Sequence, residues 1–310
     1  MATILLAWEL GGGYGHLDNM FSIGDQVEAA GHSINYVVRD LPRAELRDTS
    51  NKSKIFQAPF FQPKNSQKTS AINYSDILLR CGYNNPSDLA GLTKGWIQLI
   101  QLIKPELILV DHAPTAILAA KILTIPVCNA ATGFVFPPDI SPLPCIQTQN
   151  DTSPKKLEEK DRQALQTINS VINKFSGDKL QNIAQLFDIK HNFLCTFSEL
   201  DHYGAREGAD YCGPIYSTYG QSFPAWEQDS RKKKIFLYLS ATHPLFKSIV
   251  EQLRDSPYQV LLHPRDLKWK HNEQTIDKSL FISPRPINMN HVTQHADLII
   301  CHGGHATSSA

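Results

Sequence analysis

Two apolar segments near opposite ends of the 310-residue chain each run directly into a glycine-rich turn. Residues 3–8 lead into Gly11-Gly12-Gly13-Tyr14-Gly15-His16, and residues 296–301 lead into His302-Gly303-Gly304-His305-Ala306-Thr307. Continuous apolar runs of this length are typical of strands buried in a parallel sheet. Apolar residues at helical spacing after the first turn predict a helix there. Strand, turn and helix in this order indicate an α/β fold, in which ligands bind at the carboxyl ends of the strands.

The first turn does not match the common nucleotide-binding motifs. His16 occupies the place of the last glycine in the dinucleotide pattern G-x-G-x-x-G, and the Lys and Ser/Thr pair of a P-loop is missing. The remaining interpretation is a flexible turn that brings the imidazole of His16 to the carboxyl end of a parallel sheet. The alternative is that His16 is only a residue at a helix start.

The second turn predicts an anion site. The first amides of a helix have no intrahelical partner, and the aligned peptide dipoles favour negative charge at that end. A diphosphate group suits such a site. On these residues alone, the alternative is an ordinary strand-to-helix turn that needs glycines for its geometry.

Composition narrows the function classes. The chain has 30 basic and 30 acidic residues, which argues against a nucleic-acid partner, because such proteins normally carry a basic face. No charged segment precedes an N-terminal apolar run as in a signal peptide, and no apolar stretch approaches the roughly 18 residues of a membrane span. The six cysteines lack C-x-x-C spacing and indicate reduced thiols. We therefore expect a cytoplasmic protein.

Strand and helix patterns alternate along the chain, which predicts βαβ units and parallel sheets. Further strands are expected at residues 33–38, 54–58, 107–110, 126–129 and 192–196, the last of these closing the first domain. Helices are expected at 87–103, 115–122 and 155–187, the last with a break at 176–177. A second series contains strands at 235–239, 259–262, 280–282 and 296–301 and a helix at 244–254.

These patterns predict two Rossmann-like domains. Residues 1–215 form the first domain, and residues 216–231, where Tyr, Gly, Ser, Pro and Gln replace the periodic pattern, form a linker. Residues 232–310 form a second domain, which is expected to be incomplete because its terminal helix has barely begun.

The chain resembles GT-B glycosyltransferases. This nucleotide-sugar-dependent group includes the UDP-glucuronosyltransferases, the antibiotic-tailoring glycosyltransferases and, more distantly, the bacterial enzyme that adds N-acetylglucosamine to lipid I. The resemblance lies in the order and spacing of five segments: the loop ending in His16, residues 105–111, Gly213-Pro214, residues 236–240 and residues 296–307. It covers most of the chain and implies an acceptor-binding first domain and a donor-binding second domain.

The resemblance implies an inverting transfer in which His16 deprotonates the acceptor hydroxyl and Asp111 orients His16. A positioned base of this kind contributes roughly 10²- to 10⁴-fold to the rate. Imidazole is near the required pKa, and a carboxylate behind it fixes the tautomer and stabilises the imidazolium. The alternative for Asp111 is that it only caps the helix that Pro114 opens. His112 is a weaker rival, because it is next in sequence but directed differently.

The resemblance also assigns the donor diphosphate to the second turn. The amides of that turn, an imidazole and the hydroxyl of Thr307 would hold the charge without a metal ion. The residues implied are His302, Gly303, Gly304, His305, Ala306 and Thr307. Ser240 is a secondary phosphate candidate, with a simple turn serine as the alternative.

The nucleobase is expected near Arg285 and Ile287. Plant members of the family carry a Trp and a Gln in this region, and neither is present here, so a UDP-sugar and a dTDP-sugar both remain as donors. No cofactor is expected, because the nucleotide-sugar is a co-substrate.

The acceptor is expected to be a hydroxylated small molecule or a lipid. The loop residues expected near it are Gly13, Tyr14, Phe134 and Phe136. Their aromatic side chains suggest an apolar acceptor, with simple packing as an equal alternative. A lipid acceptor would bring the protein into peripheral contact with a membrane.

The sequence departs from the family pattern at its C-terminal end. Family members continue past the His-Gly-Gly turn with a helix, a Gly-x-Pro strand and an acidic or Gln residue that contacts the donor, and Ala306 stands where a glycine is usual. The alternative function is therefore a truncated, inactive remnant or half of a split transferase, acting as a nucleotide- or acceptor-binding module. Another chain would then complete the donor domain.

Overall fold

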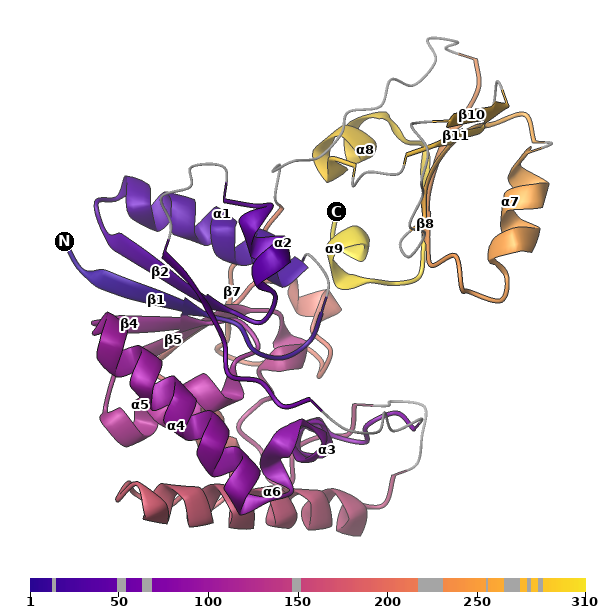
Figure 1. Ribbon diagram of the computed structural model, residues 1–310. Helices are drawn as coiled ribbons and strands as arrows, with labels where there is room; N and C mark the ends of the chain where they lie inside the picture. The colour runs from indigo at the N-terminus through magenta and orange to yellow at the C-terminus, as the bar shows by residue number, and fades with distance from the viewer. Residues whose placement is uncertain are drawn as a thin grey trace. The chain divides into compact units, whose positions relative to one another are not determined.

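The computed structural model divides into two compact units, Met1–Ile215 and Tyr216–Ala310, each of which is described by itself (Figure 1). It describes residues 1–12, 15–48, 54–62, 69–146, 152–216, 231–254, 256–264, 274–277, 280–283 and 287–310. Most of the predicted linker, residues 217–230, lies outside this description.

The first unit contains a seven-stranded sheet in the order β3-β2-β1-β4-β5-β6-β7. All neighbouring strands in it are parallel, so the predicted α/β fold with a parallel sheet is confirmed. The strands are β1 (Thr3–Ala7), β2 (Ser33–Val38), β3 (Lys54–Gln57), β4 (Leu107–Val110), β5 (Val127–Ala131), β6 (His191–Leu194) and β7 (Asp210–Tyr211). The prediction that β6 closes the first domain was wrong, because β7 pairs with it. Two residues are too few to give a recognisable strand pattern.

Helices cover both faces of this sheet, with α1 and α2 on one side and α4, α5 and α6 on the other (Figure 1). Their bounds are α1 (Gly15–Ala29), α2 (Leu41–Glu45), α3 (Tyr74–Leu78), α4 (Pro86–Ile103), α5 (Pro114–Leu123) and α6 (Pro154–Lys174). A π-helical turn spans Leu79–Tyr83, and 3₁₀ turns span Gly133–Val135, Ile183–Phe187 and Ser198–Leu200. The helical pattern expected at 155–187 is interrupted where the break at 176–177 was predicted: α6 ends at Lys174, Ser176 adopts a left-handed backbone with φ 58, and only a 3₁₀ turn follows, at Ile183–Phe187.

Local sequence explains where α4 begins and ends and where α5 begins. The side chain of Asn85 accepts a hydrogen bond from the amide of Ser87 and so caps α4, and Pro86 takes the first helical position, where its missing N–H costs nothing. Lys104 ends the same helix in the left-handed region. Pro114 opens α5 in the same way as Pro86 opens α4.

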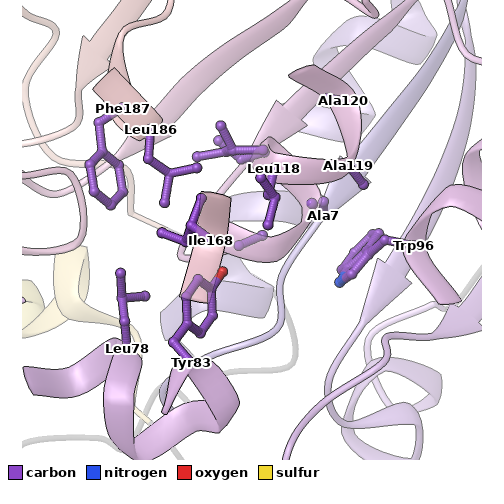
Figure 2. Close-up of a cluster of buried hydrophobic side chains, with 14 of the residues drawn as sticks. Ala7, Leu78, Tyr83, Trp96, Leu118, Ala119, Ala120, Ile168, Leu186 and Phe187 are labelled. Atoms are coloured by element: carbon purple, nitrogen blue, oxygen red, sulfur yellow. The ribbon is translucent and has the colours of Figure 1, made fainter. Parts of the chain in front are cut away.

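Alternate residues of the strands enter two separate cores. Leu5, Ala7 and Ile108 face the cluster beneath α4, α5 and α6, whereas Leu6 and Leu109 face the cluster beneath α1. Figure 2 shows part of the first cluster, in which Tyr83, Trp96, Leu118, Ile168 and Phe187 pack together. Side chains buried on both faces are what a parallel sheet between two helical layers requires.

The second unit contains a five-stranded sheet in the order β10-β11-β9-β8-β12. The strands are β8 (Lys234–Leu239), β9 (Gln259–Pro264), β10 (Gln274–Asp277), β11 (Leu280–Ile282) and β12 (Leu298–Cys301). The helices are α7 (Phe246–Arg254), α8 (Met289–His295) and α9 (His305–Ser308). The four predicted strands pair with one another in parallel, and β10 adds an antiparallel edge strand that the sequence pattern did not indicate.

Strand order reverses once in each sheet. From β1 the chain passes to β2 and β3 on one side and returns as β4 on the other. In the second unit it passes from β8 to β9 and returns on the far side as β12. Ligands of open α/β sheets bind at such reversal points, outside the carboxyl ends of the strands. Both glycine-rich turns lie there.

Candidate active site

His16 and Asp111 meet at the carboxyl ends of β1 and β4. Nδ1 of His16 lies 3.0 Å from Oδ1 of Asp111. His16 stands in the first turn of α1, and the amide of Asp111 donates to the carbonyl of Ala7 at 2.9 Å, which continues the pairing of the two strands. The structure thus brings together the two residues that the sequence singled out for proton transfer.

Asp111 affects both the pKa and the tautomer of His16, as expected for a carboxylate that orients a base. Burial lowers the pKa of His16, but the charge of Asp111 and the hydrogen bond that His16 donates to it outweigh this effect and raise the pKa above 6.5. An ionised carboxylate only accepts hydrogen bonds, so Nδ1 donates and the lone pair of the neutral imidazole is at Nε2. Asp111 is 2% exposed and fixes this tautomer.

Trp8 supports the imidazole from its face. The rings of Trp8 and His16 stack with centroids 5.3 Å apart and an interplanar angle of 23°. Trp8 is fully buried, and its indole N–H donates to the carbonyl of Leu10 at 2.5 Å. Sequence reasoning missed this residue, although its position at the end of the first strand, just before the glycine loop, was the available signal.

Glu9, and not Asp111, caps helix α5. The N-cap residue of that helix is Ala113, and Oε1 of Glu9 accepts a hydrogen bond from the amide of Thr115 at 2.6 Å. Oε2 accepts from the indole N–H of Trp96 at 2.5 Å. Burial raises the pKa of Glu9 to about 7, against the opposing effect of these hydrogen bonds. The alternative reading of Asp111 as a helix cap therefore does not describe this fold.

His112 lies beside His16 in an unusual environment. Its backbone is left-handed, with φ 54, and the residue is 7% exposed. Its ring centroid is 5.7 Å from that of His16, 5.9 Å from that of Tyr74 and 6.5 Å from that of Phe134. Burial, with a smaller effect of His16, lowers the pKa of His112 well below its ordinary value, so the ring is neutral.

Gly11 lies close to the imidazoles of both His16 and His112. It has φ +81, and a β-carbon there would lie 2.7 Å from Nε2 of His16 and 3.0 Å from Nδ1 of His112. Only glycine combines this backbone with such a close approach. The same distances show that Gly11 lies too close to the two rings for any side chain.

The predicted acceptor residues separate into three groups. Phe134 is half-buried and lies at the site, edge-on to His112. Phe136 is 3% exposed and packs against Phe187 at 5.4 Å, so its ring belongs to the core. Gly13 and Tyr14 lie outside the described residues.

A polar network from the distant segment 201–211 holds the Phe134 loop. Arg206 donates to the carbonyls of Gly133 and Phe136 at 2.9 and 2.8 Å, and Tyr203 donates to the carbonyl of Phe134 at 3.2 Å. Asp201 in turn binds the guanidinium of Arg206 at 2.9 Å. No sequence pattern links these residues to the site, since only the fold brings them together.

The second turn lies at the end of β12. Gly303 has φ +75, and a β-carbon on Gly304 would lie 3.0 Å from Nε2 of His302, so the imidazole of His302 folds over the turn. Nδ1 of His302 is 3.5 Å from the carbonyl oxygen of Tyr238 on the neighbouring strand. The amides of Thr307 and Ser308 donate to the carbonyl of Gly304 at 3.1 and 3.0 Å, which closes the first turn of α9.

The other residues assigned to the donor differ in their exposure. Ala306 is exposed and His305 is half-buried, with its pKa lowered by burial, whereas Thr307 is 8% exposed. The hydroxyl of Ser240 lies 2.7 Å from that of Thr242 and accepts from the amide of Thr242 at 3.2 Å, which is the geometry of a turn serine.

The two nucleobase candidates are not equivalent. The side chain of Ile287 is 5% exposed and packs with Phe236, Leu261 and Val292 in the core of the second unit. Only its main chain is therefore left for a base. Arg285 lies outside the described residues.

Within the described ranges, no three His, Cys, Asp or Glu side chains are grouped as metal ligands. In the same ranges, no helix combines the length and apolar character needed to cross a membrane.

Comparison with known proteins identifies the fold. No protein-family model matches the sequence, and no curated protein matches it. Solved structures match 99% of the chain. The glycotransferase of kitacinnamycin has a TM-score of 0.67, with 14% identity over 77% of its own chain. SsfS6 of Streptomyces sp. SF2575 in complex with thymidine diphosphate has a TM-score of 0.62, with 13% identity over 78% of its chain.

A third match is the spinosyn rhamnosyltransferase SpnG in complex with spinosyn aglycone. It has a TM-score of 0.61, with 15% identity over 77% of its chain. These proteins are GT-B glycosyltransferases. The chain therefore has the GT-B fold, as the resemblance in sequence predicted.

Proposed function

We propose that the chain is an inverting, metal-independent glycosyltransferase that moves a sugar from a UDP- or dTDP-sugar to a hydroxyl of a small-molecule or lipid acceptor. The observation that carries the proposal is the 3.0 Å hydrogen bond between His16 and Asp111 at the reversal point of the first sheet. A base fixed by a buried carboxylate at that point suits the activation of a hydroxyl group.

In the proposed reaction, the acceptor oxygen attacks the anomeric carbon and the bond from that carbon to the diphosphate oxygen breaks. The hydroxyl proton passes to Nε2 of His16, and Asp111 stabilises the resulting imidazolium. Attack from the side opposite the leaving group inverts the anomeric configuration. The nucleoside diphosphate leaves with the electron pair of the broken bond.

The turn after β12 is proposed to hold the diphosphate. Amides at the start of a helix and a nearby imidazole offer positive charge where negative charge develops. His302, which folds over Gly304, and the backbone from Gly303 to Ala306 are the groups assigned to this role. Thr307 is buried and Ser240 is engaged in its own turn, so we assign both a supporting role.

The ligands of the structural relatives support this reading. SsfS6 was solved with thymidine diphosphate and SpnG with spinosyn aglycone, a small-molecule acceptor. By analogy, we propose that the second unit binds a nucleoside diphosphate-sugar and that the first unit binds the acceptor near Phe134.

Nucleotide binding is the first test. The purified 310-residue chain is titrated with UDP and with dTDP by calorimetry, beside the His302→Ala variant. We expect saturable binding of one nucleotide, weakened at least about tenfold in the variant by loss of one charge-assisted contact. A folded chain that binds neither nucleotide would contradict the donor assignment.

Transfer is the second test. The chain is incubated with UDP-glucose or dTDP-glucose and a panel of phenols and aliphatic alcohols, and products are detected by mass spectrometry. His16→Ala should lower turnover by roughly 10²- to 10⁴-fold. His191→Ala, an exposed histidine at the amino end of β6, is the matched control and should leave turnover unchanged. Nucleotide binding without any transfer would favour the alternative of a binding module.

A further inference from the structure

Two cysteines follow neighbouring strands at one side of the first sheet. Cys195 comes directly after β6 and Cys212 directly after β7, and these strands are parallel, with Leu194 paired with Tyr211. One residue further along each strand, the two cysteines stand opposite each other. The amide of Cys212 donates to the carbonyl of Leu194 at 2.9 Å, so the pairing of the strands continues as far as the cysteines.

The two thiols are arranged in the same way on their strands. Sγ of Cys195 lies 3.8 Å from the carbonyl oxygen of Phe193, and Sγ of Cys212 lies 3.7 Å from that of Asp210. Phe193 and Asp210 are themselves paired in the register. Neighbouring strands are about 4.7–4.9 Å apart, and opposite residues of a parallel pair share a face. A disulfide needs Cα atoms about 4.4–6.8 Å apart, so the strand spacing allows one here.

The two cysteines differ in their access to solvent. Cys195 is 4% exposed and belongs to the core beneath α1, whereas Cys212 is exposed and follows the edge strand β7. Burial, with smaller effects of the charges of Asp111 and Cys212, raises the pKa of Cys195 to about 12. A buried, protonated thiol is inert toward an oxidant in solution. Cys212 is therefore the thiol that an oxidant reaches, and Cys195 is the thiol that lies next to it.

We propose that Cys195 and Cys212 form a redox modification site, at which a low-molecular-weight disulfide converts the two free thiols into an intramolecular disulfide. The inference does not depend on the proposed glycosyl transfer. Only the two adjacent sulfur atoms and an oxidant of the glutathione disulfide class are needed.

The exchange takes place in two steps. The thiolate of Cys212 first attacks one sulfur of glutathione disulfide, whose S–S bond breaks and releases one glutathione thiolate. The thiolate of Cys195 then attacks Sγ of Cys212, and the bond from that sulfur to the second glutathione breaks. The cysteine pair loses two electrons, glutathione disulfide gains them, and the two cysteine protons end on the two released glutathione molecules. The second step is the slower one, because Cys195 must first lose its proton.

The disulfide would close the loop from residue 195 to residue 212. This loop contains Asp201, Tyr203 and Arg206, which hold the Phe134 loop by hydrogen bonds and an ion pair. A cross-link restricts the unfolded chain, so oxidation should raise the unfolding temperature by about 5 °C. Oxidation would thus restrain the segment that positions Phe134.

The experiment treats the reduced chain with glutathione disulfide at about pH 8.5, where an exposed thiol is largely ionised. Digestion without reductant and mass spectrometry should recover most of Cys195 in a peptide joined to Cys212. Cys195→Ser should instead keep glutathione on Cys212 and show no rise in unfolding temperature, because the second attacking sulfur is missing. Cys212→Ser should leave Cys195 unmodified. Cys81→Ser, which removes a half-buried thiol elsewhere in the first unit, is the matched control and should form the joined peptide as the wild type does.

Two results would overturn the inference. One is a wild-type chain that keeps glutathione on Cys212 while Cys195 stays free. The other is a dimer joined through Cys212 of two chains, which electrophoresis without reductant detects. A joined peptide without a rise in unfolding temperature would overturn the restraint of the 195–212 loop. None of these measurements uses sugar transfer, so they leave the test of the proposed function separate.

Discussion

Nδ1 of His16 lies 3.0 Å from Oδ1 of Asp111, although the two residues are 95 positions apart in the chain. The contact is a consequence of the sheet. Strands β1 and β4 are parallel neighbours in which Ala7 pairs with Val110, so both strands end at the same level. Whatever follows the two strands is brought together, and here an imidazole meets a carboxylate.

Asp111→Asn should weaken the base without removing it. The charge of Asp111 raises the pKa of His16, so a neutral amide should lower that pKa, which an NMR titration of the imidazole measures. Turnover depends on the deprotonated ring, so the fall in activity on the acidic side should move to lower pH. The maximal turnover number, reached at higher pH, should itself fall by roughly 10²- to 10⁴-fold, because the imidazolium loses its stabilising partner. Asp178→Asn, an exposed carboxylate, is the control, and an unchanged His16 pKa in Asp111→Asn would contradict this account.

Much of the fold was predictable because buried parallel strands are continuous apolar runs. Strands β1, β2, β4 and β8 lie where the apolar pattern indicated, and α4 begins at a proline that follows a capping asparagine. The glycine turn after the first apolar strand indicated that His16 lies at the end of the sheet, and its role as the proposed base came from the resemblance to GT-B glycosyltransferases. These signals are local in sequence, and local physics decides them.

The surroundings of the site could not be predicted in the same way. The stacking of Trp8 on His16 depends on the path of the loop between them, and the capping of α5 by Glu9 depends on a contact between distant segments. Phe134 and Phe136 are two residues apart, yet one ring lies at the site and the other lies in the core. A loop sequence carries no periodicity that would distinguish them.

Comparing Trp8→Phe with Trp8→Leu should distinguish an electrostatic effect of the Trp8 ring on the pKa of His16 from a role of Trp8 in core packing alone. Trp8 stacks on the imidazole at 5.3 Å, and an aromatic face attracts the cationic form of the ring. Leucine removes that face, so the His16 pKa should fall, whereas phenylalanine should preserve most of it. Both variants lose buried area and should be destabilised, by roughly 1–3 kcal/mol. If the His16 pKa were equal in the two variants by NMR titration, stacking would have no electrostatic role.

Glu9→Gln should remove a pH dependence of stability. Below about pH 4.5 the carboxyl group is protonated in both the folded and the unfolded chain. Between 4.5 and about 7 the unfolded chain releases this proton and the folded chain retains it, so the free energy of unfolding falls with rising pH. This single group accounts for roughly 3 kcal/mol of that fall.

The measurement is guanidinium unfolding of the wild-type chain and Glu9→Gln from pH 4.5 to 8. The variant is expected to be less stable at low pH, since one of the two donors, the amide of Thr115 or the indole of Trp96, would then face an NH₂ group. Its stability should nevertheless fall less steeply with pH. Glu158→Gln, an exposed position on α6, should keep the wild-type slope. Equal slopes for Glu9→Gln and the wild type would mean that Glu9 is ionised throughout this range.

Gly24→Ala and Gly91→Ala form a matched pair that tests how α1 packs on the sheet. Both glycines are inside helices, and alanine has the higher helix propensity by about 1 kcal/mol. A β-carbon on Gly24 would lie 2.0 Å from the hydroxyl oxygen of Tyr36, whose ring is stacked on Phe21 and buried. Nothing lies within 4 Å of a β-carbon on Gly91, which is exposed.

We therefore expect Gly91→Ala to stabilise the chain and Gly24→Ala to destabilise it by roughly 1–3 kcal/mol, in thermal or denaturant unfolding. Adding Tyr36→Phe should recover part of the loss in Gly24→Ala by removing the hydroxyl that the methyl group meets, and a double variant as unstable as Gly24→Ala alone would show that the close approach is not the cause.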